Sequence, residues 1–174
     1  QTCALPILVL AGCGSGSNLA QLGQWRSDQA ARAERLLKDG WAALADETGH
    51  SPTRIQLKRK NPRAWEEFMA HLRGHSAQGS AMTARWYQGE RDSVYHWEAQ
   101  LKGMRVPALV AVGDEDAPCV EPSLFLRRTL PNAGLWVCPR TGHAINLEEP
   151  DAFNREVAGF LSSVERGGWA VPAS

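Results

Sequence analysis

The sequence predicts an α/β fold in which a small parallel sheet is interrupted by a long helical block. Three short apolar runs have the length and composition of buried strands: Leu5–Ala11, Val106–Val112 and Leu135–Cys138. Between the last two runs, Glu121–Leu130 has the pattern of a helix closed by a proline, which completes a strand-helix-strand unit. Between the first two runs, apolar residues recur at helical spacing instead.

The helical block divides into several predicted helices. Apolar residues from Leu22 to Leu44 lie on one helical face, and Gly40 is a candidate break in that stretch. A second helix is predicted to start at Pro62, which follows an asparagine. Two further helical runs cover about Ser76–Gln88 and Ser93–Lys102.

The remaining segments are predicted from charge and from helix start signals. The basic run Arg54–Lys60 is predicted to be a solvated loop. Pro150 opens a closing helix with a single apolar face. The tail after Arg166 is rich in glycine and is expected to be frayed.

Two polar runs follow the last two predicted strands and carry an acid and a base. Val112–Pro118 contains Asp116, and Arg140–Asn146 contains His143. The carboxyl ends of parallel strands lie on the same edge of a sheet, so we expect the two side chains to meet there. A carboxylate that fixes the tautomer of a histidine lets the ring take a proton from a weak nucleophile and return it to a leaving group.

Asp116 is preferred over Asp114 as the orienting carboxylate. Asp116 lies in the loop proper, whereas Asp114 directly follows Gly113 and is a candidate to cap the turn. The alternative is that the acidic run is only a polar loop between a strand and a helix, and that His143 is an exposed ring in a turn. The occurrence of both motifs after successive strands favours the acid and base.

These motifs resemble the carboxyl-terminal end of the α/β-hydrolases. The resemblance covers Val-Pro-Ala-Leu-Val-Ala-Val-Gly-Asp-Glu-Asp (106–116), Thr-Gly-His-Ala-Ile-Asn-Leu-Glu-Glu-Pro (141–150) and the amphipathic helix that follows. In that family the acid follows the last-but-one strand, the histidine follows the final strand, and a closing helix covers the sheet. The resemblance implies that Asp116 and His143 are catalytic, and it implies neither a cofactor nor a metal.

The resemblance also implies a division of the chain. Residues 1–18 would be the first strand and a hinge, 19–104 a helical cap over the active site, 105–166 the carboxyl-terminal βαβα part of the core, and 167–174 the tail. Five of the seven tryptophans fall in the cap. They are predicted either to hold the cap helices together or to line an apolar pocket that selects a hydrophobic small-molecule substrate.

The chain departs from the family in lacking a nucleophile elbow. The family's Gly-x-Ser-x-Gly precedes the acid and the base, and neither Ser15 nor Ser80 has small residues at the flanking positions. The chain has 174 residues, whereas an enzyme of this type needs about 250. We therefore expect a fragment whose partner is the missing amino-terminal half of the same fold. The first seven residues resemble translated sequencing-adapter DNA, which would place the natural start near Leu8; the alternative is an ordinary strand start.

Two other functions remain open. The loop Gly12-Cys13-Gly14-Ser15-Gly16-Ser17 nearly matches the dinucleotide fingerprint, but its third glycine is replaced by Ser17 and no acidic strand end follows. A non-catalytic half-fold that pairs with a partner chain through the exposed edge of Leu5–Ala11 is the second alternative.

Composition excludes several classes of partner. Nineteen basic and 19 acidic residues give zero formal charge, which removes a global electrostatic case for nucleic acid or an anionic membrane. The longest apolar run is far shorter than a membrane span. Four cysteines without a close pair predict free thiols in the cytoplasm rather than a disulfide framework or a zinc site.

Overall fold

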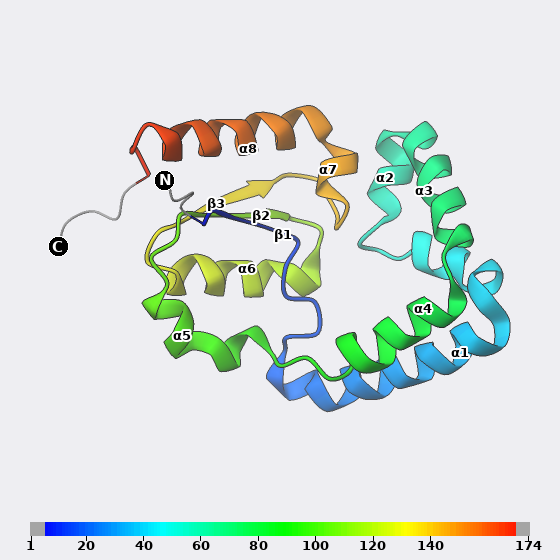
Figure 1. Cartoon of the computed structure of the whole chain (residues 1–174). Helices are drawn as coiled ribbons and strands as arrows, with labels where there is room; N and C mark the ends of the chain where they lie inside the picture. The colour runs from blue at the N-terminus through cyan, green and yellow to red at the C-terminus, as the bar shows by residue number, and fades with distance from the viewer. Residues whose placement is uncertain (1–5, 170–174) are drawn as a thin grey trace, which may run out of the picture. The chain divides into compact units, whose positions relative to one another are not determined.

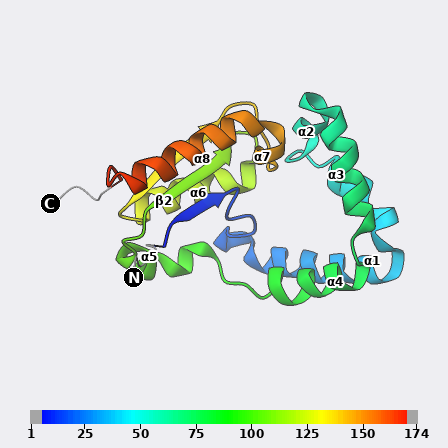
Figure 2. The same cartoon turned by 45° about the horizontal axis from the view of Figure 1, so that its top comes forward.

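The computed structural model describes residues 6–169 and contains a three-stranded parallel sheet. The strands are β1 (Leu8–Ala11), β2 (Ala108–Gly113) and β3 (Ala133–Cys138), in the order β1-β2-β3. Leu8 of β1 is paired with Ala108, which is in turn paired with Ala133 of β3. The arrowheads of β1 and β2 point the same way in Figure 2. The predicted α/β class with parallel strands is confirmed.

Helices cover both faces of this sheet, as Figure 1 shows for α6 (Ala117–Thr129) and α8 (Pro150–Glu165). All six residues of β2 are buried, as expected for a central strand of a parallel sheet. On one face, Ala108 and Val110 pack with Leu126 of α6. On the other, a cluster around Ala111 includes partly buried Phe153 of α8.

The chain forms two compact units. The sheet unit combines the described residues up to Ser15 with those from Val94 onward, and the helical unit is Gly16–Ser93. The sheet unit also contains the 3₁₀ turn η3 (Val94–Trp97), α5 (Glu98–Gly103) and the short helix α7 (Ile145–Glu148).

The helical unit consists of helices and turns alone. Its elements are η1 (Leu19–Gln21), α1 (Leu22–Gly49), α2 (Ile55–Lys60), α3 (Pro62–Gly74), α4 (Ala77–Met82) and the π-helical turn η2 (Thr83–Gln88). The predicted break in α1 is confirmed, since Gly40 has φ 69° and ψ −179°. The predicted start of α3 is confirmed too: Asn61 accepts a hydrogen bond from the Ala64 amide at 3.0 Å. Trp41 and Trp65 are buried in the core of this unit, whereas Trp86 is exposed.

A hydrogen bond joins the start and the end of the helical unit. The Ser93 hydroxyl donates to the backbone carbonyl of Ser17 at 2.5 Å, and Ser93 is only 1% exposed. A second hydrogen bond within the unit runs from the Trp25 indole to the Gln88 carbonyl at 2.9 Å. The second and the last residue of the helical unit are thus bonded to each other.

The structure differs from the sequence prediction in the basic run and in the start of α6. Residues 55–60 of the predicted loop form α2, because Leu57 is fully buried and anchors the segment. Helix α6 begins at Ala117, four residues before the predicted start at Glu121. Pro118 lies in its first turn, where the missing amide proton has no intrahelical partner to lose.

One predicted helix and the predicted tail also differ from the structure. The helical unit ends at Ser93, so the predicted helix Ser93–Lys102 lies mainly in the sheet unit, where partly buried Val94 and Leu101 pack against the sheet core. The tail predicted to fray is ordered at Trp169, whose ring packs edge-on against Phe160 with centroids 4.7 Å apart.

Two predictions concern residues that lie wholly or partly outside the described part of the chain. Residues 170–174 of the tail and residues 1–5 of the suspected adapter-derived peptide are among them. The strand predicted from Leu5 begins at Leu8. Across residues 6–169, no helix combines the length and the apolar character that a membrane span requires.

Candidate active site

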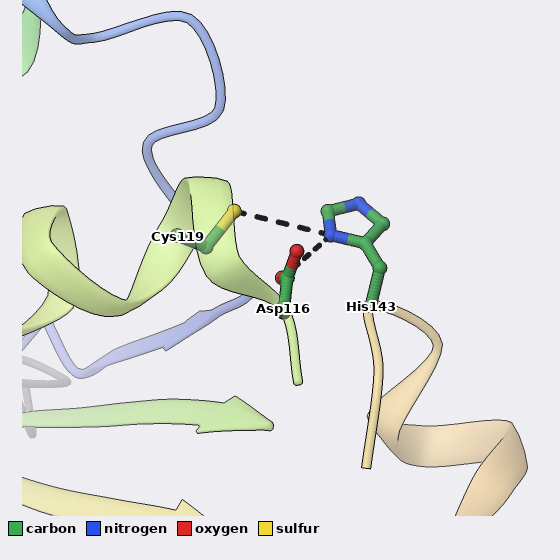
Figure 3. Close-up of side chains that lie close together, drawn as sticks. All are labelled: Asp116, Cys119 and His143. Carbon is green, nitrogen blue, oxygen red and sulfur yellow. Dashed lines mark hydrogen bonds and ion pairs between the residues drawn. The ribbon is translucent and has the colours of Figure 1, made fainter. Parts of the chain in front are cut away.

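Asp116 and His143 meet at the carboxyl-terminal edge of the sheet. Asp116 is the residue immediately before α6 in the loop that follows β2, and His143 lies in the loop after β3. Their side chains are joined by a hydrogen bond of 2.8 Å between Nδ1 of His143 and Oδ2 of Asp116 (Figure 3). The parallel topology delivers both loops to one edge, as the sequence predicted.

The two partners differ in exposure. The Asp116 side chain is 2% exposed, whereas that of His143 is 33% exposed. An ionised carboxylate only accepts hydrogen bonds, so it selects the tautomer in which Nδ1 of His143 carries the proton. The second ring nitrogen, Nε2, then has a free lone pair, and Figure 3 shows it pointing away from Asp116. This arrangement presents an oriented base.

Asp114 has a separate task in the same loop. Its Oδ1 accepts a hydrogen bond from the Thr141 amide at 3.2 Å, and the Asp114 amide donates to the Cys138 carbonyl at 3.0 Å. The Glu115 amide adds a bond to the Thr141 carbonyl at 2.9 Å. Asp114 therefore ties the acid loop to the histidine loop, and Asp116 is the carboxylate that faces the ring.

Glu148 holds the backbone on both sides of the histidine. Its carboxylate accepts from the Gly142 amide at 2.7 Å and from the Ala144 amide at 3.1 Å, and the residue is 4% exposed. Two bonds to one carboxylate fix the peptide units that flank His143. Sequence reasoning missed this residue, although an acid five positions after a Gly-His pair was the available signal.

Two glycines are required by close approach of the loops. A Cβ at Gly113 would lie 2.1 Å from the Thr141 carbonyl oxygen, so only glycine fits there. At Gly12, with φ 58°, a Cβ would lie 3.3 Å from Nδ1 of His143 and 3.5 Å from Oδ2 of Asp116. The glycine-rich loop after β1 thus packs against Asp116 and His143. This close packing explains why its first residue is glycine, and no bound pyrophosphate is needed to explain it.

Cys119 is a third side chain of the site, and the sequence did not reveal it. Its Sγ lies 3.3 Å from the Gly12 carbonyl and 4.0 Å from Nδ1 of His143. Burial, and after it the nearby Asp116 carboxylate, raise the pKa of the Cys119 thiol to about 12. A thiol that stays protonated at neutral pH serves as a hydrogen-bond donor and does not act as the nucleophile.

Asp116, Cys119 and His143 are also the one group of three metal-ligating side chains among the described residues. Their ligand atoms all lie within 4.8 Å of one another. Each residue type binds zinc in proteins, but the thiol would first have to lose its proton. Among the described residues, the His143 ring has two hydrogen-bond partners, Asp116 and Cys119. Both interact with Nδ1.

Comparison with solved structures identifies the fold. The structure of MenH from S. aureus superposes with a TM-score of 0.80 at 23% identity, covering 90% of this chain and 58% of that one. A thermophilic esterase from Thermogutta terrifontis, with malate bound, gives a TM-score of 0.77 at 23% identity, covering 90% and 56%. MGS-M2, an alpha/beta hydrolase enzyme from a Medee basin deep-sea metagenome library, gives 0.65 at 20%, covering 90% and 56%.

The chain has the fold of the α/β-hydrolases. It is a partial one, because the chain spans little more than half the length of the structures it matches. The family resemblance predicted from the two motifs is thus confirmed at the level of the fold. A scan of family models and a search of curated proteins gave no match.

Proposed function

We propose that Asp116 and His143 are the acid and the base of a hydrolase that works through a covalent intermediate. The observation that carries the proposal is the 2.8 Å bond between a buried carboxylate and a partly exposed imidazole at the carboxyl-terminal edge of the sheet. The α/β-hydrolase fold supports it, since that fold is built to place an acid and a histidine at this edge.

In the proposed reaction, Nε2 of His143 takes the proton of a nucleophile as that nucleophile attacks the substrate. His143 then returns the proton to the leaving group, and the Asp116 carboxylate stabilises the imidazolium in between. The nucleophile is assigned to a chain segment that precedes residue 1 in the whole protein, because the family's order is nucleophile, acid, base. The same cycle then runs with water to release the acyl product.

We propose an ester as the bond cleaved, with amides and carbon–carbon bonds as the wider class. Similar structures include esterases and an enol-lactonase, all of which are named for ester-type chemistry. The substrate would be a small molecule of hydrophobic character.

The remaining strands of the sheet would add at β1. Among the described strands, β1 pairs with β2 alone, and Val9 of β1 is 37% exposed.

The test is to produce this chain with its natural upstream sequence and to measure hydrolysis of p-nitrophenyl butyrate. His143→Ala is expected to reduce kcat by about 10³-fold or more, and Asp116→Asn by a similar factor, since each removes a member of a cooperating unit. His71→Ala, an exposed histidine of α3, is the matched control and should leave activity unchanged. Full activity in the His143→Ala protein would refute the proposal.

The 174-residue chain alone tests where the nucleophile lies. It should not turn over the ester, because the base has no nucleophile to activate. Turnover by this chain that disappears with His143→Ala would retain the acid and base but place the nucleophile within residues 1–174.

A further inference from the structure

The helical unit contains a cavity whose lining includes neither Asp116 nor His143. It has a volume of about 440 Å³ and lies between α1 and the segment formed by α4 and η2. Figures 1 and 2 both show α1 and α4 side by side within this unit. The volume is within the range of about 300–1,000 Å³ that is usual for small-molecule sites.

Arg32 of α1 is the charged residue of the cavity lining and is half-buried. Its guanidinium stacks over the Trp41 ring at 5.3 Å and donates to the Thr48 hydroxyl at 3.0 Å. The charge of Glu47 raises the pKa of Arg32 against the larger effect of burial, but the Glu47 carboxylate forms its ion pair with Arg35 at 2.7 Å. Among the described residues, no carboxylate forms an ion pair with Arg32.

The electrostatics of Arg32 favour an anion. Burial lowers the pKa of the Arg32 guanidinium from its ordinary value, although the group stays charged at neutral pH. A desolvated cation without an ion-pair partner gains most from a ligand that brings a negative charge. The guanidinium fork matches a carboxylate in shape and accepts it through two parallel hydrogen bonds.

The rest of the lining supplies hydrogen-bond donors and an apolar wall. The Trp41 indole donates to Oγ of Ser80 at 2.8 Å, which leaves the Ser80 hydroxyl proton to donate elsewhere. The His75 ring packs edge-on against Trp41 with centroids 6.1 Å apart. Leu36 and Ala84 provide the apolar surface. No aspartate or glutamate belongs to the lining.

We propose that this cavity binds a small organic acid, with its carboxylate on Arg32 and its apolar body against Trp41. A monocarboxylate is favoured over a phosphate because the cavity offers one guanidinium, which balances one negative charge. All residues that line the cavity belong to the helical unit. The proposal for this cavity does not depend on the hydrolase proposal.

The experiment is a titration of the ¹⁵N-labelled chain with 3-phenylpropionate, followed through the tryptophan indole resonances. The chain has seven tryptophans, and Trp41→Phe assigns the one that reports on the cavity. The Trp41 resonance should shift saturably at concentrations up to about 10 mM, the range of a weak carboxylate site. 3-Phenylpropanamide, which has the same shape without the charge, should bind at least about tenfold more weakly.

Variants identify the residue that carries the charge. Arg32→Gln should weaken 3-phenylpropionate binding by about 10-fold to 100-fold, and Arg26→Gln, at an exposed arginine of α1 outside the cavity lining, should leave it unchanged. Arg32→Lys keeps the charge without the fork and should give an intermediate affinity, which makes the test independent of any folding defect in Arg32→Gln.

Three results would overturn the proposal. They are a Trp41 resonance that does not move with 3-phenylpropionate, equal binding of the amide, and equal loss of affinity in Arg26→Gln and Arg32→Gln. In each of these cases the carboxylate is not held by Arg32.

Discussion

Replacing Glu148 by glutamine tests how the histidine loop is held. The Glu148 carboxylate accepts from the amides of Gly142 and Ala144 at 2.7 and 3.1 Å, in a place that is 4% exposed. Glutamine has one oxygen and one NH₂ group, so it satisfies one amide and turns an N–H toward the other. The variant has nearly the same volume, so packing is little changed.

The expected cost follows from the bond that is lost. A hydrogen bond to a charged group contributes about 1.5–3 kcal/mol, and a buried amide left without an acceptor costs about 1–3 kcal/mol. These two quantities overlap, so we expect the free energy of unfolding to fall by about 2–4 kcal/mol in Glu148→Gln. Urea denaturation followed by circular dichroism measures this change. Amide hydrogen exchange at Gly142 and Ala144 should accelerate in parallel.

The matched control is Glu156→Gln in α8. The Glu156 side chain is 39% exposed and pairs with Arg155 at 3.3 Å, so its loss should change stability by no more than about 0.5 kcal/mol. If Glu148→Gln were as stable as Glu156→Gln, the two amide bonds would contribute nothing to the loop, and the reasoning about Glu148 would be wrong.

Four further outcomes are expected. Gly113→Ala should prevent folding or lower the melting temperature sharply in a thermal melt, whereas Gly103→Ala, with open space around it, should not; equal melting of the two would contradict the close loop approach. With its pKa raised to about 12, Cys119 should resist iodoacetamide at pH 8 in the native chain while half-exposed Cys13 reacts, and alkylation followed by peptide mass mapping decides this. The folded chain holds the Cys119 proton more tightly than the unfolded chain. The contribution of this protonated thiol to stability is therefore complete below about pH 9 and is lost as the pH rises toward 12. Cys119→Ala should flatten that part of a curve of unfolding free energy against pH. Calorimetry with NAD should give no binding heat, and a clear signal would revive the dinucleotide hypothesis.

The elements with local signals were predictable from the sequence. Apolar runs located the three strands: the predicted ends at Ala11 and Cys138 match the observed ones, and the other four differ by one to three residues. Start signals worked because a cap acts within one turn of the chain: Asn61 caps α3, and Ser76 caps α4 by accepting from the Gly79 amide at 3.1 Å. The break at Gly40 was likewise a property of one residue.

Elements that depend on distant contacts were missed. Helix α2 carries three basic residues in six and has no long apolar face, so its sequence resembles a loop until the burial of Leu57 is known. Residues 94–104 have a helical pattern like that of the preceding block, and only their packing on the sheet core shows that they belong to the other unit.

The same contrast holds for the candidate site. The proximity of Asp116 and His143 followed from topology, since parallel strands send both loops to one edge. Cys119 and Gly12 were not predictable, because the contact between them joins residues 107 positions apart. The catalytic roles of Asp116 and His143 remain a prediction until the whole protein is assayed.

The hydrogen bond between Ser93 and Ser17 has an evolutionary consequence. It holds the two ends of the helical unit together, so the unit is attached to the rest of the chain at one fixed point. The helices between these two ends can be lengthened, shortened or replaced while β1 and β2 keep their register. Because Asp116 and His143 both belong to the sheet unit, such changes would leave the hydrogen bond between them intact.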